Sequence, residues 1–249
     1  MHRFFVSPEQ LQEEHLILGG DLAHQLCRVL RMHPGDRIVL LDNSGRAYVA
    51  ELDRATPSQC HAHIVSMSRP RTEPHTRIVL YQAVPKTQNF DWVLQKGTEI
   101  GIEAFVPLLT QRCMIQNIER ITKHKMERWR HIIKEAAEQS GRVRLPRLMQ
   151  AKTFPQACQT PPPGTLALMF SLEEKNTLSL RQVLEDNITS KPEEVWLYVG
   201  PEGGFTPHEM QQGKKTGLKI VSLGPRTLRT ETAPLVASSI ILYALGEME

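Results

Sequence analysis

Two short stretches of the chain place glycine, proline and polar side chains directly after an apolar run. "VGPEGGFTPHE" (199–209) follows "VWLYV", and "LGPRTLRTETAP" (223–234) follows "KIVS". Glycine adopts positive φ angles and lets a ligand approach the backbone closely. The spacing matches neither the dinucleotide fingerprint nor the Walker loop, and the Glu202 carboxylate would repel a phosphate. The first stretch therefore indicates a site for a cationic ligand, such as an amine or a sulfonium, or else a plain crossover turn.

The polar residues of both stretches also suit helix starts. Residues 206–209 (Thr-Pro-His-Glu) have a capping-box pattern with proline at the first helical position. In the second stretch, residues 230–232 can cap the last helix, and Pro234 suits its first turn. Arg229 beside Glu231 could form an ion pair that fixes the loop. The same residues therefore have a structural interpretation beside the functional one.

Residues 77–245 alternate between predicted strands and predicted helices. The predicted strands cover 77–84, 104–110, 165–170, 195–200 and 219–224. The predicted helices cover 89–101, 120–141, 178–186, 206–217 and 233–245. This alternation is typical of a mainly parallel sheet, which binds ligands past the carboxyl ends of its strands. We therefore expect the two stretches to lie on neighbouring strand ends and to converge on one pocket.

Residues 1–68 follow a different pattern of brief, β-branched or aromatic runs separated by turn residues. The predicted strands cover 2–6, 15–19, 36–42, 47–53 and 60–67. One predicted helix, 21–32, interrupts them, with Asp21 as a plausible N-cap. Short strands at close spacing favour a small barrel. The segment 68–76 has two prolines and mixed charge, which is typical of a linker.

Composition narrows the class of protein. No apolar run of the 249 residues is long enough to span a bilayer, and the N-terminus has no signal-peptide pattern. The four cysteines are far apart and form no C-x-x-C pair, which fits a reducing compartment. His61 and His63 could share one strand face, but such a pair alone rarely binds metal. The sequence therefore predicts a cytoplasmic protein without a membrane span or a metal.

The charge is unevenly distributed, although the net charge is only +3. Residues 111–150 contain ten Lys and Arg against four Asp and Glu, whereas residues 1–72 contain eight of each. A concentrated basic stretch is typical of a protein with a polyanionic partner. A solvated helix face explains the charge equally well.

Several motifs together carry a family resemblance. "GPEGGF" followed by "LGPRTLRTETA" closely resembles the small-subunit ribosomal RNA methyltransferases that methylate N3 of a uridine with S-adenosylmethionine, within the knotted SPOUT superfamily. Other matching stretches follow in the expected order over nearly the full chain: "HRFF", "RVLRMHPGD" (28–36), "VLQKGTEIG" (93–101), "QRC" (111–113) and "EAAEQSGR" (135–142). Pro234 departs from the pattern, but proline is tolerated in a first helical turn.

The resemblance implies a fold that periodicity alone does not give. It implies an α/β protein: a PUA-like β-barrel RNA-binding domain in residues 1–70, then a SPOUT methyltransferase domain with a mainly parallel sheet in residues 75–249. The C-terminal region of this family threads a deep trefoil knot, although general chain rules make knots nearly absent. Members form homodimers through their knot helices. Small-subunit 16S ribosomal RNA is the implied partner.

The resemblance also implies roles for individual residues. It implies that three segments bind S-adenosylmethionine. The first contains Phe170, the second Gly200, Pro201, Glu202 and Gly203, and the third Leu223, Gly224, Leu228, Arg229, Thr230 and Thr232. Leu223 and Leu228 would form apolar walls of the site. Because uracil N3 must lose a proton, Arg229 or Arg142 could stabilise the anion and Glu231 could act as base. The expected RNA contacts are Arg3, Arg28, Arg31, Arg112, Gln139 and Arg142.

Two other functions stay open on the sequence. Another SPOUT enzyme would act on a ribose 2′-hydroxyl or on tRNA, and the motifs alone do not fix the methylated atom. A non-catalytic RNA-binding or ribosome-assembly factor would keep the fold without binding S-adenosylmethionine.

Overall fold

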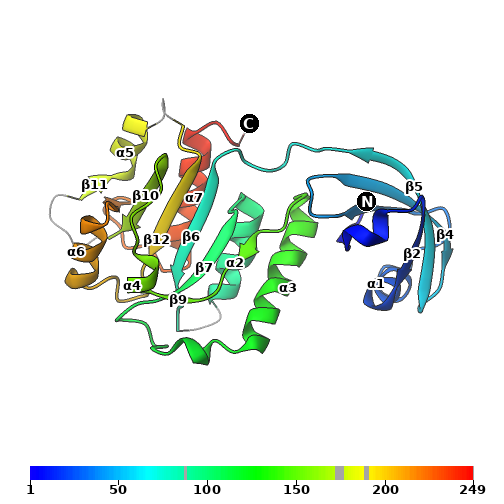
Figure 1. The fold of residues 1–249 in the computed structure, drawn as a ribbon, viewed down its shortest axis with the longest axis horizontal. Coiled ribbons are helices and arrows are strands. Elements are labelled where there is room, and N and C mark those ends of the chain that lie inside the picture. Colours follow the sequence, from blue (N-terminus) through cyan, green and yellow to red (C-terminus); the bar gives the residue numbers. More distant parts are fainter. Residues whose placement is uncertain (87–88, 172–176, 188–190, 249) are drawn as a thin grey trace. The chain divides into compact units, whose positions relative to one another are not determined.

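The chain divides into two compact units in the computed structural model, which describes residues 1–86, 89–171, 177–187 and 191–248 (Figure 1). The first unit contains Met1–Glu73 and Ala137–Leu145, and the second contains Pro74–Ala136 and Pro146–Glu249. The segment Ala137–Leu145 lies far along the sequence from the rest of the first unit. The sequence did not indicate that it belongs there.

The first unit is built on one five-stranded sheet with the order β1-β3-β4-β5-β2. Its strands are β1 (Arg3–Phe5), β2 (His15–Gly19), β3 (Arg37–Leu41), β4 (Ala47–Ala55) and β5 (Gln59–Ser68). Burial alternates along β2, where Leu16 and Leu18 are buried and their neighbours are exposed. Such alternation arises because successive side chains of a strand point to opposite faces. All five strands predicted for this part of the chain are confirmed.

The helical segment after β2 differs from the prediction. It consists of α1 (Gly20–His24) and a π-helical stretch, η2 (Gln25–Val29), rather than one regular helix over 21–32. The expected N-cap at Asp21 is wrong, because the helix begins at Gly20 and Gly19 occupies the cap position. Leu26 of η2 is fully buried in the core of this unit. A short 3-10 helix, η1 (Pro8–Leu11), was not predicted.

The second unit contains an eight-stranded sheet in which every strand pair is parallel. Its strands are β6 (Arg77–Ala83), β7 (Ala104–Leu109), β8 (Arg147–Leu148), β9 (Lys152–Thr153), β10 (Thr165–Phe170), β11 (Leu178–Ser179), β12 (Glu194–Val199) and β13 (Lys219–Ser222). The order is β11-β13-β10-β12-β6-β7-β8, and β9 also pairs with β7. The predicted parallel sheet is confirmed, and β10 lies between β12 and β13.

The helices of the second unit follow the predicted pattern closely. The predicted ones are α2 (Asn89–Ile100), α3 (Lys123–Ser140), α5 (Leu180–Asn187), α6 (Pro207–Lys215) and α7 (Thr232–Ala244). Two short helices, η3 (Ile118–Arg120) and α4 (Phe154–Ala157), were not predicted, and α3 ends within the first unit. Gly101 follows α2 with a φ of +117°, as expected for a C-terminal glycine. Among the helices of the described ranges, none is both long and apolar enough to cross a membrane.

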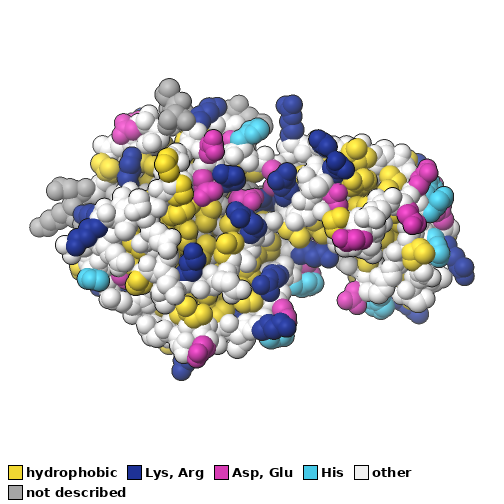
Figure 2. All heavy atoms as spheres, viewed as in Figure 1, with side chains coloured by type: hydrophobic (Ala, Val, Ile, Leu, Met, Phe, Trp, Pro, Cys, Tyr) yellow, Lys and Arg dark blue, Asp and Glu magenta, His cyan; other side chains and the backbone are white. Residues whose placement is uncertain are grey.

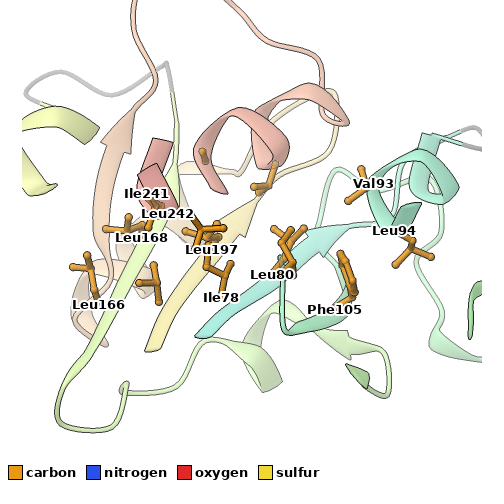
Figure 3. Close-up of a cluster of buried hydrophobic side chains, with 14 of the residues drawn as sticks. Ile78, Leu80, Val93, Leu94, Phe105, Leu166, Leu168, Leu197, Ile241 and Leu242 are labelled. Carbon is orange, nitrogen blue, oxygen red and sulfur yellow. The ribbon is translucent and has the colours of Figure 1, made fainter. Parts of the chain in front are cut away.

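Each face of the parallel sheet packs against its own helices. Along β6, Ile78 and Leu80 belong to one core cluster, which also holds buried side chains of α2, α3, α5 and α7. Figure 3 shows this cluster with Val93 and Leu94 of α2 and Ile241 and Leu242 of α7. Val79 and Tyr81 belong to a second cluster, which contains the buried side chains of α4 and α6. A strand covered by helices on both faces has a nearly continuous apolar sequence. The sheet is therefore a rigid base for the loops at its carboxyl edge.

Candidate functional site

A cavity of about 580 Å³ lies past the carboxyl ends of β10, β12 and β13. Three segments line it: Phe170–Ser171 after β10, the loop 199–205 after β12, and several residues between 221 and 233, with Asn89 at the start of α2. The expected convergence of the two glycine-containing stretches is confirmed. Their strand ends are not neighbours, however, because β10 separates β12 from β13. The end of β10 therefore forms the part of the pocket between the two loops.

The loop after β12 depends on glycine for its shape. A Cβ at Gly200 would lie 3.1 Å from the Gly204 carbonyl carbon and 3.3 Å from the Phe205 ring. Gly204 has a φ of +67° and donates its N–H to the Pro201 carbonyl oxygen at 2.8 Å, which closes a tight turn. A Cβ at Gly200 would push the turn apart, whereas one at Gly204 would meet no atom within 4 Å but would be strained by the positive φ. The glycines thus bring backbone into direct contact with the cavity.

The helix start that follows is a capping box, as predicted. The Thr206 hydroxyl accepts from the Glu209 N–H at 3.2 Å, and the Glu209 carboxylate accepts from the Thr206 N–H at 2.8 Å. The same carboxylate accepts from the Gln111 N–H at 2.9 Å, and Arg112 donates to the Gly203 carbonyl oxygen. The segment after β7 therefore holds the outer side of the glycine loop.

Thr230 connects the two loops. Its hydroxyl donates to the Gly200 carbonyl oxygen at 2.7 Å and accepts from the Gln82 side-chain amide at 3.1 Å. Both Thr230 and Gln82 are buried. Since Gln82 lies near the end of β6, one hydroxyl joins the ends of two central strands to the C-terminal loop. The sequence predicted Thr230 as a cap or cofactor contact and missed this bridge.

The expected cap at the start of α7 is wrong for Glu231. Glu231 occupies the N-cap position in an α-helical conformation and makes no side-chain cap hydrogen bond. Its carboxylate lies 3.9 Å from the Arg229 guanidinium, so the predicted ion pair is present but long. The Glu231 side chain is 15% exposed and that of Arg229 is 85% exposed. Both residues line the cavity, where they place a carboxylate and an unburied cation side by side.

Most residues expected to contact the cofactor line this cavity. Lining residues among them are Phe170, Gly200, Pro201, Glu202, Gly203, Leu223, Leu228, Arg229 and Thr230. Gly224 is not among the lining residues, and Thr232 lines an adjoining recess instead. The Glu202 carboxylate accepts from the Lys86 N–H at 3.2 Å. Actual contact with a cofactor stays a prediction for all of them.

The residues expected to contact RNA lie in both units. Arg3, Arg28, Arg31 and Gln139 are exposed residues of the first unit, and the Arg3 guanidinium lies close to Gly141. Arg112 is exposed in the second unit, where it holds the glycine loop. On the face drawn in Figure 2, Lys and Arg side chains are scattered among hydrophobic and acidic ones. Contact with RNA stays a prediction for each of these residues.

Arg142 has a structural environment that the sequence did not reveal. The side chain is 4% exposed, and its guanidinium donates to the Glu73 carboxylate at 2.6 and 3.0 Å. The other oxygen of Glu73 accepts from the N–H groups of Val143 and Arg144 at 3.0 and 3.2 Å. This buried pair fixes the segment 141–145 within the first unit. Its expected roles toward uracil or RNA remain predictions.

The described part of the chain contains no cluster of three or more His, Cys, Asp or Glu residues that could hold a metal ion. His61 and His63 both lie on β5, and the His63 imidazole is 2.8 Å from the Asp53 carboxylate. His63 therefore has a carboxylate partner within the sheet.

Both parts of the chain match models of known domain families. An RNA methyltransferase domain model matches residues 72–242, and an RNA methyltransferase PUA domain model matches residues 18–65. The Bacillus subtilis ribosomal RNA small subunit methyltransferase E is 32% identical over 98% of this chain and 96% of its own length. The Synechocystis protein of that name is 35% identical over 95% of this chain and 75% of its own. The chain belongs to the ribosomal RNA small subunit methyltransferase E family.

Solved structures of this family agree with the fold. A ribosomal RNA small subunit methyltransferase E from Neisseria gonorrhoeae, bound to S-adenosyl methionine, superposes with a TM-score of 0.86. It is 30% identical and covers 98% of this chain and 97% of its own. A methyltransferase from Legionella pneumophila in complex with SAM gives the same TM-score at 30% identity, over 97% of each chain. The expected PUA-like domain and α/β methyltransferase domain are thereby confirmed.

Several lining residues lie outside the expected set. They are Asn89, Ser171, Val199, Gly204, Phe205, Val221, Arg226, Thr227 and Ala233. Most adjoin a predicted residue in the sequence, so a wider window around each strand end would have found them. Asn89 is different, because it lies more than 80 residues earlier in the chain. Only the packing of α2 beside α7 brings it to the cavity.

Proposed function

We propose that the protein uses S-adenosylmethionine to methylate N3 of one uridine in the 16S RNA of the small ribosomal subunit. The observation that carries the proposal is the cavity of about 580 Å³ built by both glycine-containing stretches at the carboxyl edge of the sheet. Family membership supports the reaction, and ligands of open parallel sheets bind at this edge.

The residues of the cavity suit this cofactor. Its volume lies within the usual range of about 300–1,000 Å³ for small-molecule sites. Phe170, Leu223 and Leu228 supply apolar walls, and the glycine loop offers backbone where a Cβ would crowd the turn. Glu202 and Glu231 place carboxylates in the lining, which favours a sulfonium over an anion.

The side chains at the mouth of the cavity have separate tasks. When bound, S-adenosylmethionine supplies a methyl carbon that leaves its sulfonium sulfur, which keeps the bonding electron pair, and joins uracil N3. Glu231 accepts the N3 proton, and its low exposure shields it from water. Arg229 stabilises the negative charge that the base acquires, and its exposed guanidinium can move toward the RNA. The order of substrate binding does not alter these tasks.

Arg142 is the less favoured partner of the uracil anion. Its guanidinium is buried in the ion pair with Glu73. Breaking a buried pair costs about 3–5 kcal/mol, because a charge is left without a partner. Arg142 therefore acts on RNA by fixing the segment 141–145 and its neighbours, among which Arg144 is exposed.

RNA is recognised through both units in this proposal. The PUA-like unit supplies Arg3, Arg28 and Arg31, and the second unit supplies Arg112. Arginine is well suited to phosphate because its planar guanidinium donates two parallel hydrogen bonds. The proposal includes a cytoplasmic location, in agreement with four cysteines that are free thiols.

The proposal also includes a trefoil knot and a homodimer. The helix α7 contacts β12 and β6, whereas β13 lies on the far side of β10. The segment between β13 and α7 must therefore cross back past the ends of β10 and β12, which supports the knot. On α7, Ile240 and Tyr243 are 43% and 73% exposed. An apolar exposed face on a knot helix supports pairing with a second copy.

Titration calorimetry with S-adenosylmethionine and a methylation assay on small subunits test this function together. We expect cofactor binding by the protein and transfer of one methyl group to the RNA. Arg229→Ala should keep cofactor affinity within about threefold and lower the transfer rate by about 100-fold or more. A normal transfer rate in this variant would remove Arg229 from the mechanism. No binding of the cofactor by the wild-type protein would favour a non-catalytic assembly factor.

A further inference from the structure

A second recess opens beside the cofactor cavity. Its volume is about 710 Å³, and it shares Asn89, Arg229 and Glu231 with that cavity. We call it the annex, and its remaining lining residues are Asp91, Trp92, Gln95, Ile132 and Thr232. The annex is lined mainly by the outer face of α2. Because Arg229 and Glu231 line both spaces, a group bound in the annex would lie beside the cofactor cavity.

The annex contains an exposed indole. Trp92 is 52% exposed, whereas Trp129 is 1% exposed in the core. The Lys96 ammonium lies 5.2 Å from the Trp92 ring centre and 2.7 Å from the Glu99 carboxylate, so the ring is oriented by a cation that is itself held in place. An exposed, oriented aromatic ring beside a reaction site is a stacking platform for a nucleobase.

Asp91 is excluded as the proton acceptor by its contacts. One carboxylate oxygen accepts from the Trp129 indole N–H at 3.1 Å, and the other accepts from the Arg128 guanidinium. Asp91 therefore fixes the first turn of α2 against α3. Glu231, with its single long ion pair of 3.9 Å, is the carboxylate of the annex that is better placed to take a proton.

The polar side chains of the annex fit the edges of uracil. With N3 directed to the methyl donor, uracil presents the oxygens O2 and O4, which need hydrogen-bond donors. The side-chain amides of Asn89 and Gln95 each offer two N–H donors, and Arg229 offers donors only. Cytosine carries an amino group in place of O4, and a guanidinium cannot accept from it, whereas it can donate to either oxygen of uracil. The Arg229 side chain therefore favours uracil over cytosine.

We propose that the annex holds the target uracil flipped out of the RNA, stacked on Trp92, with its oxygens bound by Asn89, Gln95 and Arg229. This inference rests on the proposed methyl transfer and names the residues that position its substrate. Trp92, Asn89 and Gln95 are positioning and specificity residues. Placing the base here leaves the cofactor cavity free for S-adenosylmethionine, so both substrates bind at once.

Two substitutions at Trp92 test the proposal in the full-length protein. Loss of base stacking weakens binding by about 5- to 150-fold per base. In Trp92→Ala we therefore expect a rise of this size in KM for small subunits, with the affinity for S-adenosylmethionine unchanged. Trp92→Phe keeps a stacking surface and should recover most of the loss. Met149→Ala is the matched control, because Met149 is a 38% exposed apolar residue outside both recesses.

A second readout does not depend on catalysis. A short uridine-containing RNA, added to protein saturated with S-adenosylmethionine, should quench tryptophan fluorescence in the wild type and not in Trp92→Phe. Equal quenching in both proteins, or an unchanged KM in Trp92→Ala, would overturn the proposal. Conversion of Trp92→Ala from dimer to monomer in sedimentation would also overturn it, because Trp92 would then belong to the contact between copies. Absence of methylation by the wild type would instead refute the proposed function.

Discussion

Replacement of Gly200 by alanine should weaken the binding of S-adenosylmethionine without unfolding the protein. The added Cβ would meet the carbonyl carbon and Cα of Gly204 at 3.1 and 3.2 Å and the Phe205 ring at 3.3 Å. These distances are shorter than ordinary van der Waals contacts. Two of the three atoms are backbone, so they cannot rotate away as a flexible side chain could. The turn itself must shift by a few tenths of an ångström.

The size of the effect follows from the cost of overpacking. Extra carbon atoms in a well-packed site typically cost about 1–3 kcal/mol. If this strain opposes the loop geometry that binds the cofactor, the affinity falls by about 5- to 150-fold. The turn is also held by Thr230, whose hydroxyl donates to the Gly200 carbonyl oxygen at 2.7 Å. The loop therefore has little freedom to relieve the contact elsewhere.

Titration calorimetry of Gly200→Ala with S-adenosylmethionine measures this effect, and circular dichroism checks that the variant is folded. Gly19→Ala is the matched control, because a Cβ there meets no atom within 4 Å and its φ is −115°. The control should bind the cofactor as the wild type does. A folded Gly200→Ala protein with wild-type affinity would refute the assignment of this loop to the cofactor.

Three further predictions concern bonds and burial elsewhere in the protein. Thr230→Val removes the buried hydroxyl and should lower the free energy of unfolding, measured by urea denaturation, by about 1–3 kcal/mol. Thr230→Ser should retain the hydrogen bond to Gly200. An equal loss of stability in both variants would contradict the hydroxyl's role. Glu73→Gln leaves the Arg142 guanidinium buried without a counter-charge and should destabilise the first unit by about 3–5 kcal/mol. The cavity belongs to the second unit, so the cofactor affinity should not change. Calorimetry at a temperature where the variant is folded measures this affinity. Burial raises the pKa of the Cys60 thiol from 9.0 to about 11. The stability that the buried, protonated thiol contributes is therefore complete below pH 9 and is lost as the pH rises through 11. The rate of Cys60 alkylation, followed by mass spectrometry, should rise toward pH 11, and a midpoint near pH 9 would count against this burial effect.

Much of the fold could be predicted because its elements are locally encoded. In the second unit, apolar runs bounded by turn residues predicted the long strands. Along α3, Met126, Trp129, Ile133 and Ala136 recur at helical spacing and are all buried. Short elements such as β8, β9 and β11 were missed, since two residues carry no periodicity. The placement of Ala137–Leu145 in the first unit was also missed. It involves contacts between residues far apart in the sequence, such as the Arg142–Glu73 pair, 69 positions apart, and the packing of Ala137 and Val143 against Phe5.

The candidate site was predicted to a similar extent and for similar reasons. The glycines of both loops stand out in the sequence, and two of them, Gly204 and Gly224, have positive φ angles that exclude most side chains. Thr230 looked like a helix cap, whereas its hydroxyl joins Gly200 and Gln82. Contacts of this kind depend on which strands are neighbours, and the order of β10 between β12 and β13 could not be read from the sequence.

Mass spectrometry of RNA from small subunits that lack the modification, after incubation with the protein and S-adenosylmethionine, tests the central claim most directly. The account predicts one added methyl group on N3 of a single uridine in the 16S RNA. The Gly200→Ala protein should give the same product at a lower rate when the cofactor is limiting. Methylation of a ribose or of tRNA, or no methylation of small-subunit RNA under conditions where the cofactor binds, would contradict it.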